Sequence, residues 1–364
     1  MKIEHYYLLL MLSMKPKGKM VDFNHIAEKF GRDLKIFEKE KIKSIIDDLV
    51  KQGFIQIKNG LYGASEKGRE FFKKELKKVG KDLEKINKCW LLIYKSKQYY
   101  PIVKDTILKF CKDRYVGFYC VFTQKRFFRR DFKGRKIVIN SWKDLEFFVN
   151  MHCIDIIPCV HRIGSEKPDW LVIDIDPGSK IDFSETKEIA KFAYKLMEKL
   201  DLNPVIKFSG SRGFQIWSSI EDFEIPKWYR PLQLKSQRKR EISYFSLFSD
   251  FVRVIQKEID KKFPGLTSSS PLQKDESKIL IDPSSMKRLG LVRSPYSIHS
   301  KSGLVSLPIS YKEIERFKFD DACIEKALER YNKKGNEFEL KSSSPSKLLE
   351  ILKNYMGLNL WKTI

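Results

Sequence analysis

The chain has 364 residues, of which 42% are hydrophobic, so it is long enough for two or three folded domains and too apolar to be disordered. Its 71 lysines and arginines outnumber its 47 aspartates and glutamates, which gives a formal net charge of +24 at pH 7. This excess favours a polyanionic partner such as a nucleic acid, and the alternative is a lysine-rich surface without a specific partner.

The six cysteines are scattered along the chain without the spacing of a disulfide framework. Free thiols are typical of a reducing compartment, and the N-terminal residues lack the features of a signal peptide. No apolar stretch is long enough to cross a bilayer. The composition therefore predicts a cytoplasmic protein with no membrane partner.

Residues 1–80 begin with three segments in which apolar residues have helical spacing, and FIQIKNGLYGAS follows them. Its Asn59-Gly60 pair is typical of the tight turn of a β-hairpin. The run LVKQGFIQIKNGLYGASEKGREF resembles the third helix and wing of winged helix-turn-helix domains, in which that helix enters the DNA major groove. The resemblance implies DNA contacts from Lys39, Lys41, Lys43 and Lys58. The alternative is a domain that binds only proteins and whose lysines form a solvated face.

A charged and aromatic stretch at 81–100 is predicted to be a linker to a catalytic domain at 101–312, and residues 313–364 to be a C-terminal helical segment. Within the catalytic domain, YVGFYCVFTQKRFFRRDFKGRKIVIN predicts strands with interleaved basic and aromatic residues. Basic side chains bind phosphates, and exposed aromatic rings stack on unpaired bases. The pattern predicts either a nucleic-acid surface or an ordinary sheet with one solvated face; the basic candidates are Lys125, Arg126, Arg129 and Arg130.

Two histidines and two cysteines lie close together in the next segment: His152, Cys153, Cys159 and His161. Structural zinc sites usually show two cysteines separated by two to four residues, and this segment has no such pair. We expect buried thiols and ordinary histidines here.

WLVIDIDPG at 170–178 is an apolar run that carries Asp174 and Asp176. Side chains two positions apart in a strand point to the same face of the sheet. Two neighbouring carboxylates in an apolar setting are costly unless a cation binds them, and Mg²⁺ or Mn²⁺ prefers such oxygen ligands. The run therefore predicts a strand that presents a metal-binding pair.

Two further motifs follow. VIKFSGSRGFQIW at 205–217 places a glycine-rich turn between strands, and the N–H groups of such a turn and the guanidinium of Arg212 suit phosphates. A later strand ends at Asp282, and the basic residues Arg293, His299 and Lys301 follow it. A third carboxylate beside the first pair would complete a two-metal site for chemistry on a nucleotide.

Three motifs, DID at 174–176, SGSRGFQ at 209–215, and Asp282 followed by RSPYSIHSKSGL, resemble those of the archaeo-eukaryotic primase superfamily. VNMHCIDIIPCVHRIGSEKPDWLVIDIDPG is most similar to the polymerase domain of prokaryotic end-joining ligases, and RSPYSIHSKSGLVSLP to the small catalytic subunit of archaeal primase. The resemblance implies an α+β fold, with a primase-like catalytic core built on an RRM-like palm sheet behind the winged-helix domain.

The resemblance also implies roles for individual residues. Asp174, Asp176 and Asp282 would be the catalytic metal ligands. The nucleotide-binding segments would contain Ser209, Gly210, Arg212, Gly213, Gln215, Arg293, His299 and Lys301. One position departs from the superfamily pattern, because Gln215 stands where a histidine usually contacts the incoming triphosphate. Glutamine donates a neutral hydrogen bond but carries no positive charge.

Together the motifs predict a template-dependent nucleotidyltransferase, a DNA primase or primase-polymerase, with Mg²⁺ or Mn²⁺ as cofactor. Its partners would be a DNA template or primer and nucleoside triphosphates, in replication or break repair. One alternative is a DNA-binding protein of the same fold with weakened catalysis, for which Gln215 is the argument. A metal-dependent nuclease is another, although it would not need the segment 293–303.

Overall fold

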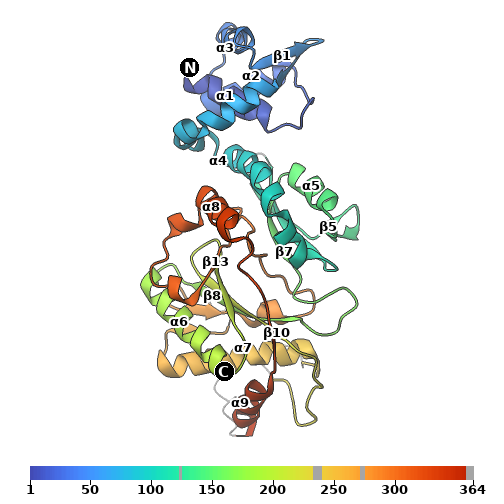
Figure 1. The fold of residues 1–364 in the computed structure, drawn as a ribbon, viewed down its shortest axis with the longest axis vertical. Helices are drawn as coiled ribbons and strands as arrows, with labels where there is room; N and C mark the ends of the chain where they lie inside the picture. Colours follow the sequence, from blue (N-terminus) through green and yellow to red (C-terminus); the bar gives the residue numbers. More distant parts are fainter. Residues whose placement is uncertain (123–124, 233–239, 271–274, 358–364) are drawn as a thin grey trace. The chain divides into compact units, whose positions relative to one another are not determined.

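The computed structural model describes residues 1–122, 125–232, 240–270 and 275–357. It contains two compact units (Figure 1). The first consists of residues 1–101, 120–127 and 147–153, and the second of residues 102–119, 128–146 and 154–364. Among the helices within the described ranges, none is both long enough and apolar enough to span a membrane.

The first unit is built around helix α1 (Ile3–Ser13), whose run of leucines is fully buried. Helices α2 (Phe23–Leu34) and α3 (Lys39–Lys51) are amphipathic, and α3 packs on α1 through Ile42, Ile45, Ile46 and Leu49. Strands β1 (Ile55–Lys58) and β2 (Leu61–Ala64) follow as an antiparallel pair. Asn59 and Gly60 have φ values of +50° and +71°, so the predicted hairpin turn is confirmed.

Helix α4 (Glu66–Cys111) differs from the prediction of a linker at 81–100, because the chain there is helical except at Asn87. Asn87 has φ −154° and ψ 84°, and its side-chain oxygen accepts from the Trp90 N–H, which caps the second part of the helix. The aromatic and aliphatic side chains after Asn87 are buried: Trp90, Leu91, Leu92, Ile93, Tyr94, Tyr99 and Tyr100. These residues belong to the core of the unit, which is why the stretch is not an exposed connection.

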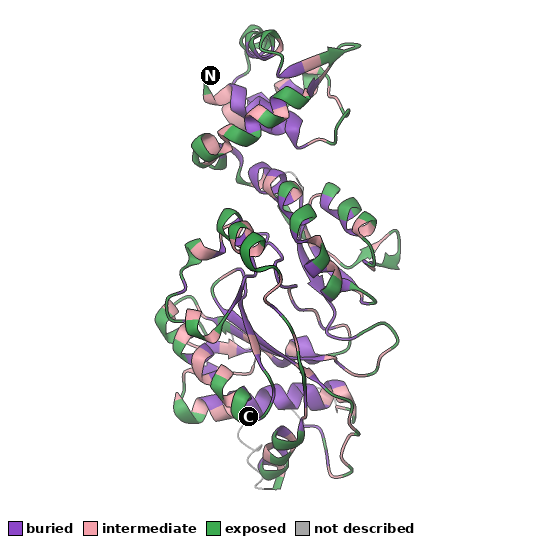
Figure 2. Cartoon of the chain, in the orientation of Figure 1, coloured by how far each residue is buried: buried purple, intermediate pink, exposed green. Residues whose placement is uncertain are grey.

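The second unit contains a seven-stranded sheet in the order β11-β12-β8-β10-β9-β13, with β14 paired to β10. Its central strands are β8 (Trp170–Pro177), β10 (Phe214–Ile220) and β9 (Val205–Phe208), which pair antiparallel. The outer strands are β11 (Thr267–Ser268), β12 (Ile279–Ile281), β13 (Pro308–Ile309) and β14 (Ser342–Ser343). The central strands are almost wholly buried (Figure 2).

Helices α6 (Phe183–Lys199) and α7 (Tyr244–Lys262) pack on this sheet and on each other. Asp182 caps α6 in a capping box with Glu185. Alternation along β8 directs Leu171, Ile173 and Ile175 to one face and Asp174 and Asp176 to the other. Phe183 at the start of α6 stacks on Phe214, and Phe214 pairs with Ile175 in register. The carboxylates therefore occupy the face opposite the helices.

The remaining elements lie before and after this sheet in the chain. A three-stranded sheet has the order β4-β3-β7, and its strands are β3 (Val116–Phe122), β4 (Lys125–Arg129) and β7 (Cys153–Pro158). A separate two-stranded sheet is formed by β5 (Asp131–Phe132) and β6 (Arg135–Lys136). Helix α5 spans Trp142–Asn150. At the C-terminal end, α8 (Ile324–Lys334) and α9 (Ser346–Gly357) agree with the predicted helical segment. Strand β14 does not, because it joins the main sheet beside β10. Two serines carry no apolar pattern that would predict a strand.

Arg330 on α8 binds two carboxylates of the second unit. Its two terminal nitrogens each lie 2.8 Å from a Glu313 oxygen, and it also pairs with Glu337. The hydrogen bonds from Arg330 lower the pKa of Glu313 from 4.5 to about 2. A carboxyl whose pKa is lower in the folded state stabilises the fold above its unfolded pKa, and this contribution is lost as the pH falls.

We expect Glu313→Gln to lower the free energy of unfolding at pH 7 by about 2 kcal/mol, after allowance for partial exposure. The variant should also lose less stability than the wild type between pH 4.5 and about 2, because it lacks the depressed carboxyl. Urea denaturation at a series of pH values measures both effects. Glu198→Gln, at an exposed ion pair with Lys195, is the control. Equal pH slopes for Glu313→Gln and wild type would contradict the expectation.

Candidate active site

A row of polar side chains crosses the three central strands. Asp174 on β8 pairs in register with Gln215 on β10, and Gln215 pairs with Lys207 on β9. Paired residues of an antiparallel sheet point to the same face, so all three side chains lie opposite α6 and α7. Lys207 is fully buried, and Gln215 is 4% exposed. Two of these residues were candidates from the sequence, whereas Lys207 was not.

Asp282 joins the row from β12, which pairs antiparallel with β8. The Asp282 N–H lies 3.3 Å from the Asp174 carbonyl oxygen. Burial and then the charges of Asp176 and Asp282 raise the pKa of Asp174 to about 6, from an ordinary value of 3.8. The structure thus gathers the three predicted carboxylates at one end of β8 and β12, where they repel one another.

The carboxylates fit a hard divalent cation in the chemistry of their donors, since Mg²⁺ and Mn²⁺ take oxygen ligands and relieve such repulsion. Asp176 is exposed, whereas Asp174 and Asp282 are partly buried. The Asp282 oxygens accept hydrogen bonds from the Ser284 N–H and hydroxyl at 2.8 and 2.7 Å, and a carboxylate has further lone pairs. Among the described residues, no three His, Cys, Asp or Glu side chains stand close enough to form a ready-made metal cage.

The glycine-rich turn follows β9 and lies beside β8. Its Ser209 hydroxyl accepts from the N–H groups of Ser211 and Gly213, so the serine closes the turn. A Cβ on Gly213 would lie 1.8 Å from the Ile175 carbonyl oxygen, and Gly210 has a φ of +87°. Both positions therefore require glycine. Arg212 donates from Nη2 to the Pro177 carbonyl oxygen at 3.0 Å, which brings its guanidinium to the end of β8.

A cavity of about 280 Å³ opens at this end of β8. Asp176, Arg212 and Lys278 line it, together with Gly178 and two further acidic residues, Asp275 and Glu276. A carboxylate that can hold a cation and two basic side chains thus face the same space. This is the combination that a polyphosphate with a bound divalent ion requires.

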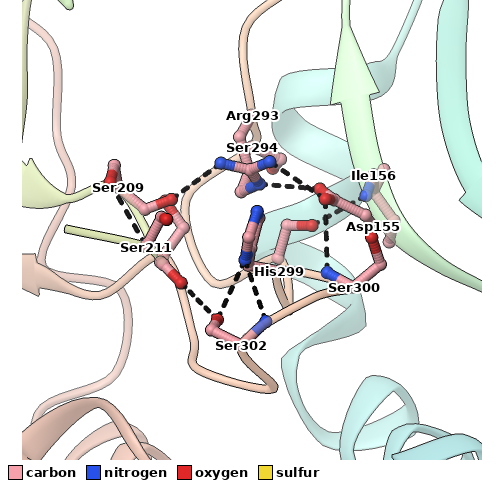
Figure 3. A network of polar contacts seen from close by, with 12 residues as sticks. Asp155, Ile156, Ser209, Ser211, Arg293, Ser294, His299, Ser300 and Ser302 are labelled. Carbon is pink, nitrogen blue, oxygen red and sulfur yellow. Dashed lines mark hydrogen bonds and ion pairs between the residues drawn. The ribbon is translucent and has the colours of Figure 1, made fainter. Parts of the chain in front are cut away.

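Arg293 does not face that cavity. Its Nε and Nη2 lie 2.7 and 2.9 Å from the two oxygens of Asp155 on β7, and its Nη1 donates to the Ser209 carbonyl oxygen at 2.8 Å (Figure 3). Asp155 is 1% exposed. The pair therefore links β7 to the glycine-rich turn. Asp155 was not a candidate from the sequence, although a carboxylate within the apolar run CIDII gives the same signal as the pair on β8.

His299 lies next to the same turn, since a Cβ on Gly210 would be 3.0 Å from the His299 Cβ. Its Nδ1 accepts from the Ser302 N–H, and the Ser302 hydroxyl donates to the Gly210 carbonyl oxygen (Figure 3). The predicted His299 is thus brought next to the turn, and Ser302, which the sequence did not single out, connects them. Lys301 is exposed on the loop between these two residues.

The other candidate residues lie elsewhere. Lys125 and Arg126 are exposed on β4, and the guanidinium of Arg130 lies over the Phe128 ring. Lys39, Lys41, Lys43 and Lys58 are exposed on α3 and β1 of the first unit. His161 has a backbone partner at each ring nitrogen, Arg162 and Leu289, and the thiols of Cys153 and Cys159 are buried.

Comparison with known proteins gives matches to a family model and to solved structures. The family model of the LigD primase-polymerase domain matches residues 120–338. The polymerase domain of Mycobacterium tuberculosis ligase D, solved in complex with DNA, is similar in structure with a TM-score of 0.54 and 16% sequence identity, over 66% of this chain and 89% of that one. None of the curated proteins compared with the chain is significantly similar to it.

These matches confirm the α+β fold and the archaeo-eukaryotic primase superfamily that the three motifs predicted. Because the family model covers more than half of its residues, the chain belongs to the LigD primase-polymerase family, and through it to the nucleotidyltransferases. The match begins at residue 120, so the winged-helix class of residues 1–80 stays a prediction.

Proposed function

We propose that the chain is a template-dependent nucleotidyltransferase that extends or initiates a nucleic-acid strand in DNA replication or break repair. The observation that carries the proposal is the gathering of Asp174, Asp176 and Asp282 beside a cavity that Arg212 and Lys278 line. The related ligase D polymerase domain was solved with DNA, which supports DNA as the partner of this chain.

Each of these residues would have a separate role in the reaction. Asp174, Asp176 and Asp282 would hold Mg²⁺ or Mn²⁺, which would supply positive charge beside the phosphates and the attacking hydroxyl. Arg212 and Lys278 bind the triphosphate of the incoming nucleotide in the cavity. The 3′-oxygen of the strand attacks the α-phosphorus, the bond to the β-phosphate breaks, and pyrophosphate leaves. The glycine-rich turn, held by Arg293 and Ser302, keeps Arg212 at the end of β8.

Primer extension with labelled nucleotides, in the presence of either Mn²⁺ or Mg²⁺, tests the proposal. A primer paired to a longer template should grow by nucleotides that complement the template. An absence of both extension and priming by the wild-type chain with either metal would refute it.

A second candidate is a DNA-binding protein of the same fold with weakened catalysis. The observation in its favour is Gln215, which offers a triphosphate no positive charge. In that case DNA binding would persist while extension is slow with either metal, and Gln215→His would lower the apparent KM for the nucleotide. An unchanged KM would remove the argument.

We also propose that α3 and the β1–β2 hairpin contact DNA phosphates. Replacement of Lys39, Lys41 and Lys43 by glutamine removes three exposed positive charges from α3. Each lost phosphate contact lowers the slope of log affinity against log salt by about 1, so we expect a slope about 3 smaller and weaker binding to DNA of any sequence. Fluorescence anisotropy at several salt concentrations measures this.

The matched control replaces Lys73, Lys74 and Lys77, which are also exposed but lie on α4. It changes the net charge by the same amount. If both triple variants lose the same affinity and the same slope, net charge is responsible and α3 makes no specific contact.

A further inference from the structure

Lys207 is an unusual residue for the central part of a sheet, because its side chain is fully buried. Its Nζ donates to the Gln215 side-chain oxygen at 2.7 Å and to the Ser306 hydroxyl at 2.6 Å. It also lies 5.3 Å from the centre of the Trp217 ring. A charged or neutral amine has enough hydrogens for both bonds. A lysine side chain is rarely fully buried unless its amine is paired, so the role of these contacts needs an explanation.

The bond from Lys207 fixes the orientation of the Gln215 amide. An amine group of lysine donates to the amide oxygen, so the oxygen faces Lys207 and the NH₂ group faces away. On that side Gln215 is the cross-strand neighbour of Asp174 in register, and the contact of its amide with the carboxylate lowers the pKa of Asp174. Since Asp174 accepts, the amide NH₂ donates. Lys207, Gln215 and Asp174 therefore form one chain of hydrogen bonds across β9, β10 and β8.

These contacts use the Gln215 oxygen for Lys207 and one amide hydrogen for Asp174, and burial of the side chain keeps the second hydrogen from a nucleotide. If the amide turned toward a triphosphate, it would remove a partner from the buried Lys207 amine and one from Asp174. An unsatisfied buried donor is costly, so the observed orientation is strongly preferred. The buried position of Gln215, at 4% exposure, favours the same arrangement.

We propose that Lys207 and Gln215 are positioning residues that fix the Asp174 carboxylate for metal binding, and that Gln215 is not a ligand of the triphosphate. The inference rests on the proposed function, in which Asp174 holds the divalent ion. Hydrogen bonds from a second layer of residues orient metal ligands, and their removal typically lowers metal affinity or activity by about 10- to 100-fold. Lys207 orients the amide, and the amide orients the carboxylate.

A double-mutant cycle on Mn²⁺ affinity tests this. Lys207→Met and Gln215→Met remove the polar groups with little change of length, and isothermal titration with Mn²⁺ alone measures binding without DNA or nucleotide. We expect each single variant to bind Mn²⁺ about 10- to 100-fold more weakly. Because the two residues act through one chain of hydrogen bonds, the double variant should bind no more weakly than the weaker single variant.

Gln256→Met is the matched control, since Gln256 is a buried glutamine on α7 whose amide donates to Thr267. It should bind Mn²⁺ as the wild type does. Circular dichroism shows whether each variant is folded. If Lys207→Met does not fold, the Mn²⁺ affinity of Gln215→Met alone tests the inference, because this substitution removes the contact with Lys207 and the contact with Asp174. Wild-type Mn²⁺ affinity in a folded Gln215→Met, or additive losses in the cycle, would overturn the inference.

The steady-state kinetics of nucleotide incorporation distinguish a positioning role of Gln215 from a role as a ligand of the triphosphate. A positioning role predicts that Gln215→Met lowers kcat with little change in the KM for the nucleotide, whereas a triphosphate ligand would raise KM. The two proposals can fail separately. A wild-type chain that binds Mn²⁺ through Asp174 but extends no primer refutes the polymerase and leaves this inference standing. A wild-type chain that binds no Mn²⁺ overturns the inference.

Discussion

Replacement of Asp174 by asparagine is expected to lower the rate of nucleotide incorporation by about a thousandfold. The substitution removes one of the charges that hold the divalent ion, and loss of about 4 kcal/mol of transition-state stabilisation gives a factor of this size. Asparagine has nearly the same shape, and its side-chain oxygen can accept the hydrogen bond from Gln215. Primer extension under single-turnover conditions measures the loss.

The same substitution is expected to stabilise the metal-free protein. Burial and the charges of Asp176 and Asp282 raise the pKa of Asp174 to about 6, above its unfolded value of 3.8. The folded state therefore holds the proton more tightly, so the free energy of unfolding falls as the pH rises from 3.8 to about 6, and the whole cost is present above that pH. A neutral side chain avoids this cost, which is about 3 kcal/mol.

Urea denaturation in the presence of a chelator, at pH 4 and pH 7, measures the gain in stability. It should be present at pH 7 and almost absent at pH 4, where Asp174 is largely protonated in the folded state. Glu198→Gln on the exposed surface of α6 should show neither the gain nor the loss of activity. Full activity in Asp174→Asn, or lower stability than the wild type at pH 7, would contradict the assignment.

The placement of Asp174 and Asp176 on one face of a strand is predicted from the sequence because its signal is local. Asp174 and Asp176 stand in an apolar run, and strand alternation alone puts them on one face. The signal for the hairpin at Asn59-Gly60 is equally local, and the structure confirms it. In each case the deciding residues are within a few positions of one another.

The residues that the sequence did not indicate act through contacts between distant segments. Asp155 and Arg293 are 138 positions apart, and only the fold shows that the arginine binds this carboxylate. Lys207 and Ser306 are 99 positions apart. The linker prediction at 81–100 differs from the structure for a related reason, because Trp90 of this stretch stacks on Tyr7 of α1.

Replacement of Asp155 by alanine is expected to lower the free energy of unfolding by about 3–5 kcal/mol, the usual cost of breaking a buried ion pair. Asp155 is 1% exposed and binds Arg293 through both oxygens. Without it, the guanidinium loses both contacts with the carboxylate and keeps its bond to the Ser209 carbonyl oxygen. The loosened turn should also slow incorporation, because Arg212 is held at the end of β8 by the same turn. Urea denaturation and primer extension measure the two effects.

The double variant Asp155→Ala/Arg293→Met decides whether the two residues act as a pair. It removes both charges, so its loss of stability should be smaller than the sum of the single losses, by an interaction energy of about 1–3 kcal/mol. Glu198→Ala, which breaks the exposed pair with Lys195, should cost at most about 1 kcal/mol. A loss of under about 1 kcal/mol in Asp155→Ala, or additive losses in the cycle, would show that the pair does not hold β7 to the glycine-rich turn. A stable but inactive Asp155→Ala would instead place the role of Asp155 in alignment of the turn.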